Sequence, residues 1–149
     1  MRKDYFGWHS DRLPCPARVM RWGHYGKPVL LYPTAGGDCE EAERQGLIAS
    51  LSGLIDAGRI KVYSVDSVAG QHWMSRQHSP EYCSPVHTRS DAFIYEAVSP
   101  LDRNDCSSTG LEIVASGASF GACTAVASGW RRRVGVWLAL GVGGASDVA

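Results

Sequence analysis

The chain has 149 residues, a length that leaves room for one domain. Its formal net charge is zero, and a neutral chain lacks both the attraction to phosphates that nucleic-acid binding uses and the polybasic surface that binds anionic membranes. Hydrophobic residues make up 44% of the chain, which together with its aromatic residues supplies the core material that disordered chains lack. We therefore expect one globular domain, residues 1–149, with neither nucleic-acid nor membrane partners.

The five cysteines indicate neither a metal site nor a disulfide framework. Their number is odd and no Cys-x-x-Cys pair occurs, which excludes zinc-ribbon and thioredoxin-like patterns. His72, His78, Cys83 and His87 lie close together in the sequence, but their spacing fits no zinc pattern. Unpaired thiols are typical of a reducing compartment. We therefore expect no metal and no cofactor.

The N-terminal segment, residues 1–9, begins with basic residues but has no apolar run behind them, so it does not have the pattern of a secretory signal. No stretch of the sequence approaches the roughly 18 consecutive apolar residues of a membrane-spanning helix. These two patterns predict a cytoplasmic location.

The first elements in chain order are two strands and a helix. Residues 17–22 alternate loosely and predict a strand, and the apolar run 29–32 between two prolines predicts a buried one. After the loop 33–38, Asp38 and Glu41 have the spacing of a capping box at a helix start. The helix that follows places five apolar residues on one face, and Gly58 ends it. These five residues are Leu47, Ile48, Leu51, Leu54 and Ile55.

The rest of the chain continues the alternation of strands and helices. Residues 60–65 are rich in β-branched side chains and predict a strand, whereas residues 68–88 are irregular and proline-containing and predict a long loop. Alternating strands and helices favour a mostly parallel sheet with helices on both faces. The later predicted elements are a helix at 90–98 that buries Phe93, Ile94, Ala97 and Val98 and ends before Pro100, a strand at 111–115, a turn at 117–121, a helix at 122–128 and a strand at 134–140.

The most informative motif is the pentapeptide at residues 117–121, which fits G-x-S-x-G with Ser119 at its centre. In a nucleophile elbow, the serine occupies a strained strand-to-helix turn, and the flanking Gly117 and Gly121 let neighbouring backbone pass close by. The helix after the turn adds a positive dipole where an oxyanion would form. A plain glycine-rich turn would give the same five letters, but the β-rich run before it and the small-residue helix after it favour the elbow.

A second candidate lies in the small-residue loop at 33–38, after the buried strand 29–32. Loops at the carboxyl ends of strands bind ligands in open α/β sheets. An oxyanion hole needs two backbone donors, namely the residue after the nucleophile, here Phe120, and one from such an early loop. Ala35 and Gly36 are both candidates for the second donor, and the sequence does not choose between them.

These segments resemble the α/β-hydrolase superfamily and its putative-esterase (esterase D-like) branch. The resemblance covers residues 10–128 and is carried by the stretches 22–34, 61–67 and 117–121. It implies an α/β-hydrolase fold, an ester as the small-molecule substrate, and hydrolysis through a Ser–His–Asp/Glu triad. It carries over Ser119 as the nucleophile and the Phe120 N–H as an oxyanion donor.

The chain departs from this pattern after the serine. In the fold that it resembles, the acid and the histidine follow the nucleophile, but all five histidines here precede Ser119, and Asp147 is the only acid after it. We therefore expect a partial hydrolase domain, truncated or changed in reading frame, with weak activity. The alternatives are a non-catalytic remnant or interaction module of the same fold, and an acyltransferase. An exposed strand at 134–140 would favour self-association through its edge.

Three histidines and one tryptophan each have two interpretations. One of His72, His78 and His87 could act as an unusual base for Ser119, since a base is defined by geometry rather than by chain order, although ordinary loop positions explain them as well. Trp73 either lines an acyl pocket or fills the core.

Overall fold

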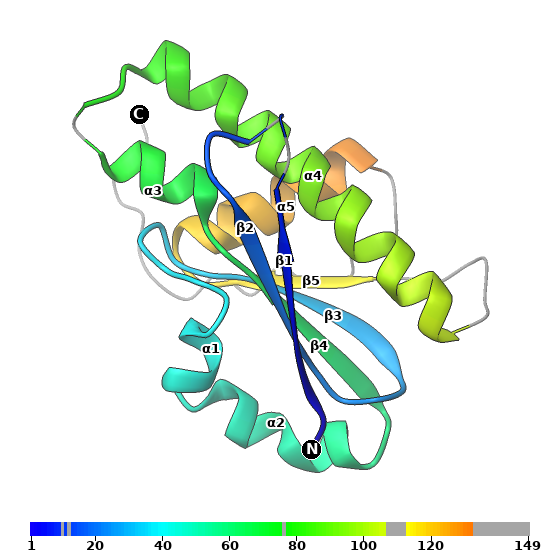
Figure 1. The fold of residues 1–149 in the computed structure, drawn as a ribbon. Coiled ribbons are helices and arrows are strands. Elements are labelled where there is room, and N and C mark those ends of the chain that lie inside the picture. Colours follow the sequence, from blue (N-terminus) through cyan, green and yellow to red (C-terminus); the bar gives the residue numbers. More distant parts are fainter. Residues whose placement is uncertain (10, 12, 76, 107–112, 133–149) are drawn as a thin grey trace.

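A computed structural model describes residues 1–9, 11, 13–75, 77–106 and 113–132 of the chain. These residues form one five-stranded sheet with helices on both faces (Figure 1). The strands are β1 (Lys3–Trp8), β2 (Ala17–Trp22), β3 (Lys27–Tyr32), β4 (Ile60–Val65) and β5 (Val114–Gly117). The helices are α1 (Glu41–Arg44), α2 (Leu47–Asp56), α3 (Val68–Met74), α4 (Pro80–Cys106) and α5 (Phe120–Arg132). The strand expected at 134–140 lies outside the described residues.

The sheet has the strand order β1-β2-β4-β3-β5. Strand β3 pairs in parallel with both β4 and β5, whereas β2 pairs antiparallel with β4 and with β1. Four of the five described strands therefore run in one direction and only β2 opposes them, which confirms the mostly parallel sheet. Because β3, β4 and β5 are parallel, the loops that follow them emerge at one carboxyl edge.

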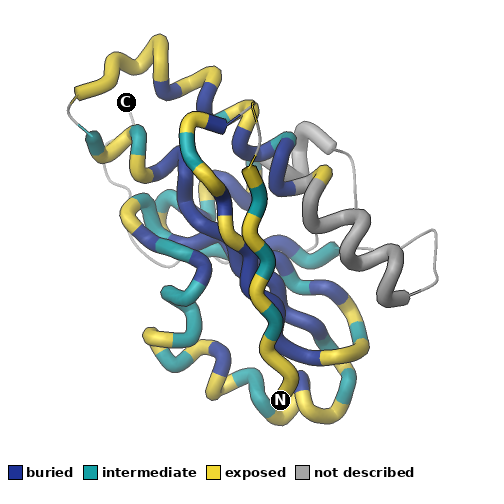
Figure 2. Tube along the Cα trace, viewed as in Figure 1, coloured by how far each residue is buried: buried dark blue, intermediate teal, exposed yellow. Residues whose placement is uncertain are grey.

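Each face of the sheet is covered by its own apolar cluster. Helices α3, α4 and α5 cover one face, where Phe93 and Ile94 of α4 pack against Tyr63 and Val65 of β4. Helix α2 covers the other face with Ile48 and Ile55. Figure 2 shows the buried residues concentrated in the central strands, between the two helical layers. Every strand in the middle of the sheet is thus buried from both sides, as parallel strands require.

The long loop expected at 68–88 was wrong, because most of this segment is helical. Helix α3 fills the first part, and α4 begins at Pro80. Proline is well suited to the first turn of a helix, where its missing N–H would have no partner. The carbonyl of Ser79 accepts the amides of Tyr82 and Cys83, which closes that first turn.

The helix expected at 90–98 is the middle of α4, which continues through Pro85 and Pro100. The part of α4 before residue 90 was predicted as a loop because it contains Pro80 and Pro85. Ser90 and Asp91 are buried beside the expected Phe93 and Ile94. The side chains of Ala97 and Val98 lie outside the described residues.

Two smaller features of the first half of the chain differ from the sequence expectations. Strand β1 was not predicted, yet it pairs along its whole length with β2. The capping box was wrong, because the Asp38 carboxylate accepts the amide of Glu40 while the Glu41 carboxylate accepts the amide and hydroxyl of Thr34. Helix α1 therefore begins without a side-chain cap.

Helix α2 buries only part of its predicted apolar face. Ile48 and Ile55 are buried, whereas Leu47 and Leu54 are more than 40% exposed. The predicted end is present, since Gly58 has a φ of 68° and donates to the carbonyl of Ile55 while Arg59 donates to that of Leu54. This pair of bonds is the Schellman arrangement that glycine favours.

Among the described residues, no helix combines the length and apolar character needed to cross a membrane.

Candidate functional site

Ser119 lies in the short turn between β5 and α5. Strand β5 ends at Gly117 and helix α5 begins at Phe120. The φ of Ser119 is 55°, the only positive φ of a non-glycine residue in the described part of the chain. A residue with a Cβ pays about 1–2 kcal/mol for this left-handed conformation, so the surrounding structure must hold the turn in place. The side chain of Ser119 is exposed at the start of α5.

The two glycines of the pentapeptide hold this turn by close backbone contacts. A Cβ built on Gly117 would lie 2.4 Å from the carbonyl carbon and oxygen of Gly121. A Cβ built on Gly121 would lie 2.3 Å from the carbonyl oxygen of Tyr32 and 2.5 Å from that of Pro33. Neither position can accept a side chain without moving backbone. The second contact also presses the Ser119 turn directly against the end of β3.

The loop after β3 is therefore the immediate neighbour of the Ser119 turn. Tyr32, the last residue of β3, is the register partner of Gly117. Beyond it the chain makes a β-turn in which Gly37 donates to the carbonyl of Thr34 at 2.9 Å. Ala35 and Gly36 are the two central residues of this turn, and within the described part of the chain their amides donate to no protein acceptor. The amide of Phe120 is one of the first-turn N–H groups that an α-helix leaves unpaired.

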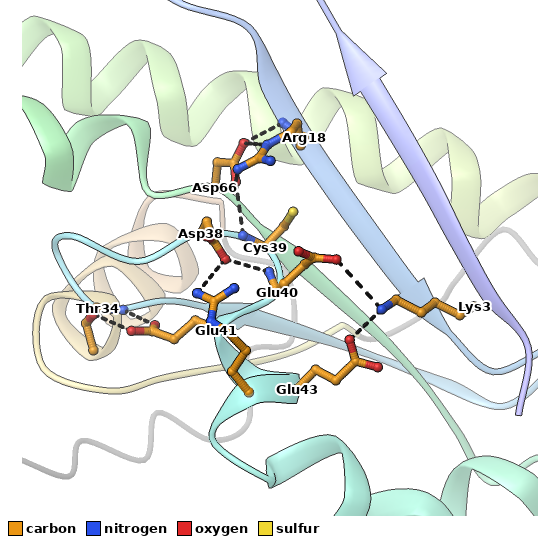
Figure 3. Close-up of polar contacts among 10 residues, drawn as sticks. Lys3, Arg18, Thr34, Asp38, Cys39, Glu40, Glu41, Glu43 and Asp66 are labelled. Atoms are coloured by element: carbon orange, nitrogen blue, oxygen red, sulfur yellow. Dashed lines mark hydrogen bonds and ion pairs between the residues drawn. The ribbon is translucent and has the colours of Figure 1, made fainter.

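A buried aspartate ties this loop to β2 and β4. Asp66 follows β4 and accepts two hydrogen bonds from the Arg18 guanidinium, at 2.8 and 3.1 Å, and one from the Arg18 amide (Figure 3). Its other contact is the amide of Cys39, which donates to it at 3.0 Å. The hydrogen bonds to Asp66 raise the pKa of Arg18 above its ordinary value. The loop is thus fixed at its far end by a buried, charge-assisted cluster.

A second set of polar contacts fixes the near end of the loop. The Glu41 carboxylate binds Thr34 twice, accepting its amide at 2.8 Å and its hydroxyl at 2.6 Å. A Cβ on Gly37 would lie 2.5 Å from the same carboxylate and 2.7 Å from the Cβ of Pro33, so a side chain there would have to displace Glu41 or Pro33. Arg44 pairs with Asp38 at 2.9 Å. Figure 3 shows the Glu41 side chain extending from α1 to Thr34.

Cys39 is fully buried beneath the loop. Burial raises the pKa of its thiol to about 12, and the nearby Asp66 carboxylate adds to the effect. The thiol is therefore neutral at physiological pH, and Cys39 is a packing residue rather than a nucleophile.

A cavity of about 460 Å³ opens beside both segments. Pro33 and Thr34 line it from the β3 loop, Gly117 and Ala118 line it from the Ser119 turn, and Leu47 lines it from α2. A volume in this range accommodates a small molecule. The two candidate segments therefore border one shared space.

Two groups of histidines lie on different sides of α3 and α4. His72 and His78 stack on each other with ring centroids 5.3 Å apart, and both lie against Tyr82. His87 packs on the ring of Phe120 at 5.2 Å, and its Nε2 lies 3.4 Å from the Thr124 hydroxyl. His87 is thus in contact with the residue that follows Ser119. Within the described part of the chain, no three His, Cys, Asp or Glu side chains are arranged to share a metal ion.

The sequence predicted that the β3 loop and the Ser119 turn lie side by side, but it did not indicate which residues hold the loop in place. Asp66 and Glu41 fix the loop, yet neither was a candidate for this role. One signal was available for Asp66, because a charged residue directly after a buried strand lies at the carboxyl edge of the sheet. For Glu41, the capping-box spacing predicted a hydrogen-bonding role at the start of the helix, but the partner of Glu41 in the structure is Thr34.

No family model and no curated protein matches the sequence. Solved structures do match. The fold is that of the α/β-hydrolases. A protein of unknown function described as an α/β-hydrolase fold aligns with a TM-score of 0.64 at 14% identity, covering 95% of this chain and 44% of that one. A ferulic acid esterase from Anaeromyces mucronatus aligns with a TM-score of 0.65 at 13% identity, over 91% of this chain and 56% of that one.

An S-formylglutathione hydrolase from Staphylococcus aureus aligns with a TM-score of 0.59 at 12% identity, over 91% of this chain and 54% of that one. This chain thus spans about half the length of these α/β-hydrolase structures. At such identities the likeness establishes the α/β-hydrolase fold and carries over no residue role.

Proposed function

We propose that the chain carries the nucleophile and oxyanion hole of a serine hydrolase that acts on small-molecule esters. The observation behind this proposal is the juxtaposition of two segments, in which the strained turn at Ser119 presses through Gly121 on the carbonyls that begin the β3 loop. The α/β-hydrolase fold and the names of its structural neighbours support an ester as the substrate class.

In this proposal the Ser119 hydroxyl oxygen attacks the acyl carbonyl carbon and its proton passes to a base. The carbonyl oxygen gains the negative charge, which the amide of Phe120 and the amide of Ala35 or Gly36 stabilise by hydrogen bonds. The positive end of the α5 dipole acts in the same direction. Collapse of the intermediate releases the alcohol, and water then cleaves the acyl-enzyme. Transfer of the acyl group to another alcohol is the acyltransferase variant of the same second step.

The proposed reaction also needs a base that takes the Ser119 proton. No histidine follows Ser119 in these 149 residues, whereas the base follows the nucleophile in the α/β-hydrolases that the sequence resembles. A serine without its base retains only about 10³- to 10⁴-fold acceleration over water. We therefore expect slow hydrolysis of activated esters by this chain. The second candidate is a non-catalytic module of the hydrolase fold.

Hydrolysis of p-nitrophenyl acetate by the chain and by Ser119→Ala tests the proposal. We expect slow turnover that Ser119→Ala abolishes, with Ser84→Ala, an exposed serine on α4, as the matched control that leaves the rate unchanged. Turnover that survives Ser119→Ala would overturn the nucleophile assignment. No turnover by either protein would favour the non-catalytic module. Fast turnover would instead require a histidine base, and His87→Ala would be the first variant to examine because His87 contacts Phe120.

A further inference from the structure

Helix α3 lies directly against the loop proposed as the oxyanion donor. A Cβ on Gly70 would lie 2.5 Å from the carbonyl oxygen of Ala35 and 2.7 Å from its Cα. A Cβ on Gly36 would lie 3.4 Å from the sulfur of Met74, an ordinary van der Waals distance. The helix thus packs on Ala35 without an intervening side chain, and the Met74 thioether covers Gly36.

Two large apolar side chains extend from this contact into solvent. Trp73 and Met74 are three and four residues beyond Gly70, so they share the helix face that Gly70 presents to the loop. They are 40% and 63% exposed. This exposure answers the question that the sequence left open, because a tryptophan filling the core would be buried. Exposed apolar side chains that adjoin a candidate site offer a surface that an apolar ligand can cover.

The opposite side of α3 is already occupied. The His72 ring lies against both His78 and Tyr82, with ring centroids 5.3 and 6.0 Å away, and its Nδ1 is 2.8 Å from the carbonyl of Val68. The amide of Ser67, before the helix, donates to the carbonyl of Gly37 at 3.3 Å. Both ends of α3 are therefore fixed, and Trp73 and Met74 extend from its packed face beyond the contact with the loop.

We propose that Trp73 and Met74 form the wall that binds the acyl group of the ester, and that this wall selects apolar acyl groups larger than acetyl. The inference rests on the proposed function for the placement of the carbonyl. With the carbonyl oxygen at the amide of Ala35 or Gly36, the first carbons of the acyl group lie next to the Met74 thioether. A longer acyl chain continues along the helix face to Trp73. An acetyl group is too short to use this surface.

Binding can be tested without turnover in the Ser119→Ala protein labelled with ¹³C in its methionine methyl groups. The chain has three methionines, and Met20 is buried in the α2 face of the sheet, which makes it an internal reference. We expect methyl hexanoate to shift the Met74 methyl signal and to leave Met20 unmoved, with methyl acetate shifting neither. A Met74 signal that does not move up to the solubility limit of methyl hexanoate would overturn the proposal.

Selectivity provides a second test through the ratio of kcat/KM for p-nitrophenyl hexanoate to that for p-nitrophenyl acetate. We expect the double variant Trp73→Ser, Met74→Ser to lower this ratio about tenfold, since several buried methylene groups lose their contacts. The control is Leu54→Ser on α2, whose side chain is similarly exposed and should leave the ratio unchanged. An unchanged ratio in the double variant would refute the wall. If the unmodified chain hydrolyses neither ester, the proposed function fails, and the methionine signals still decide whether the wall binds acyl groups.

Discussion

The two segments that meet at the carboxyl edge of the sheet are held in place by different means. The loop after β3 is fixed by side chains, with Glu41 on Thr34 and Asp66 on Cys39 and Arg18. The Ser119 turn is fixed by the absence of side chains, because Gly117 and Gly121 bring backbone against backbone. Removing or neutralising a charged partner should therefore destabilise the loop. Adding a side chain at either glycine should destabilise the turn.

The largest expected effect is that of Gly121→Ala. The added Cβ would lie 2.3 Å from the Tyr32 carbonyl oxygen, and backbone cannot move aside as a flexible side chain can. We expect a loss of about 3 kcal/mol or more in the free energy of unfolding, measured by urea denaturation.

The matched control for this change is Gly53→Ala. Gly53 is an exposed glycine in α2 with no neighbouring atom within 4 Å of an added Cβ. Alanine in a helix interior should stabilise the protein there by about 0.5–1 kcal/mol. Equal stability losses for Gly121→Ala and Gly53→Ala would show that the close backbone contact at Gly121 does not stabilise the turn.

Asp66→Ala should have the next largest effect. It leaves the buried amide of Cys39 without its acceptor and Arg18 without its carboxylate. We expect a loss of about 2–3 kcal/mol, less than for a wholly buried pair because the Arg18 side chain is 44% exposed. Asp56→Ala, at an exposed aspartate, should change the urea midpoint little. A loss at Asp66 no larger than that at Asp56 would show that side-chain contacts do not hold the loop.

Ser119→Gly should raise stability relative to Ser119→Ala. Both variants remove the hydroxyl, but only glycine adopts a φ of 55° without steric cost. We expect glycine to be more stable than alanine by about 1 kcal/mol, with both variants inactive toward p-nitrophenyl acetate. The opposite order of unfolding midpoints would mean that the turn carries no strain.

The smallest expected effect is the pH dependence of the contribution that Asp38 makes to the stability of the folded protein. Burial acts to raise the pKa of this carboxyl, but the hydrogen bonds from Arg44 and from the Glu40 amide outweigh it and lower the pKa below 3.8. A lowered folded-state pKa contributes stability above the unfolded value, and this contribution disappears as the pH falls through the folded value. The difference in unfolding midpoint between the original chain and Asp38→Asn should therefore shrink from pH 7 to pH 3.

The Ser119 turn provides the reference for that measurement. Its five residues contain no titratable side chain, so the stability difference between Ser119→Gly and Ser119→Ala should stay constant over the same pH range. If the stability difference between Ser119→Gly and Ser119→Ala also changed with pH, the two segments would not differ in their response to charge.

The sequence by itself determined the central strands and the two segments at their ends. The run before Pro33 and the β-branched residues of β4 identify buried strands, since such strands need apolar side chains on both faces. The G-x-S-x-G spacing identified the turn, because the close approach of backbone permits only glycine at its first and last positions. Each of these requirements concerns neighbouring residues, so a few consecutive residues of the sequence are enough to show it.

The tertiary structure decided what depends on distant partners. The first part of α4 was predicted as a loop because prolines are typical of loops, whereas in the fold its Tyr82 and Cys83 contact His72 of α3. Strand β1 exists because β2 supplies its hydrogen-bond partners, and its own sequence carries little apolar alternation. The roles of Asp66 and Trp73 likewise depend on which residues the fold brings to them. Hydrogen-bond partners and exposure arise from packing across the chain, which no short stretch of sequence records.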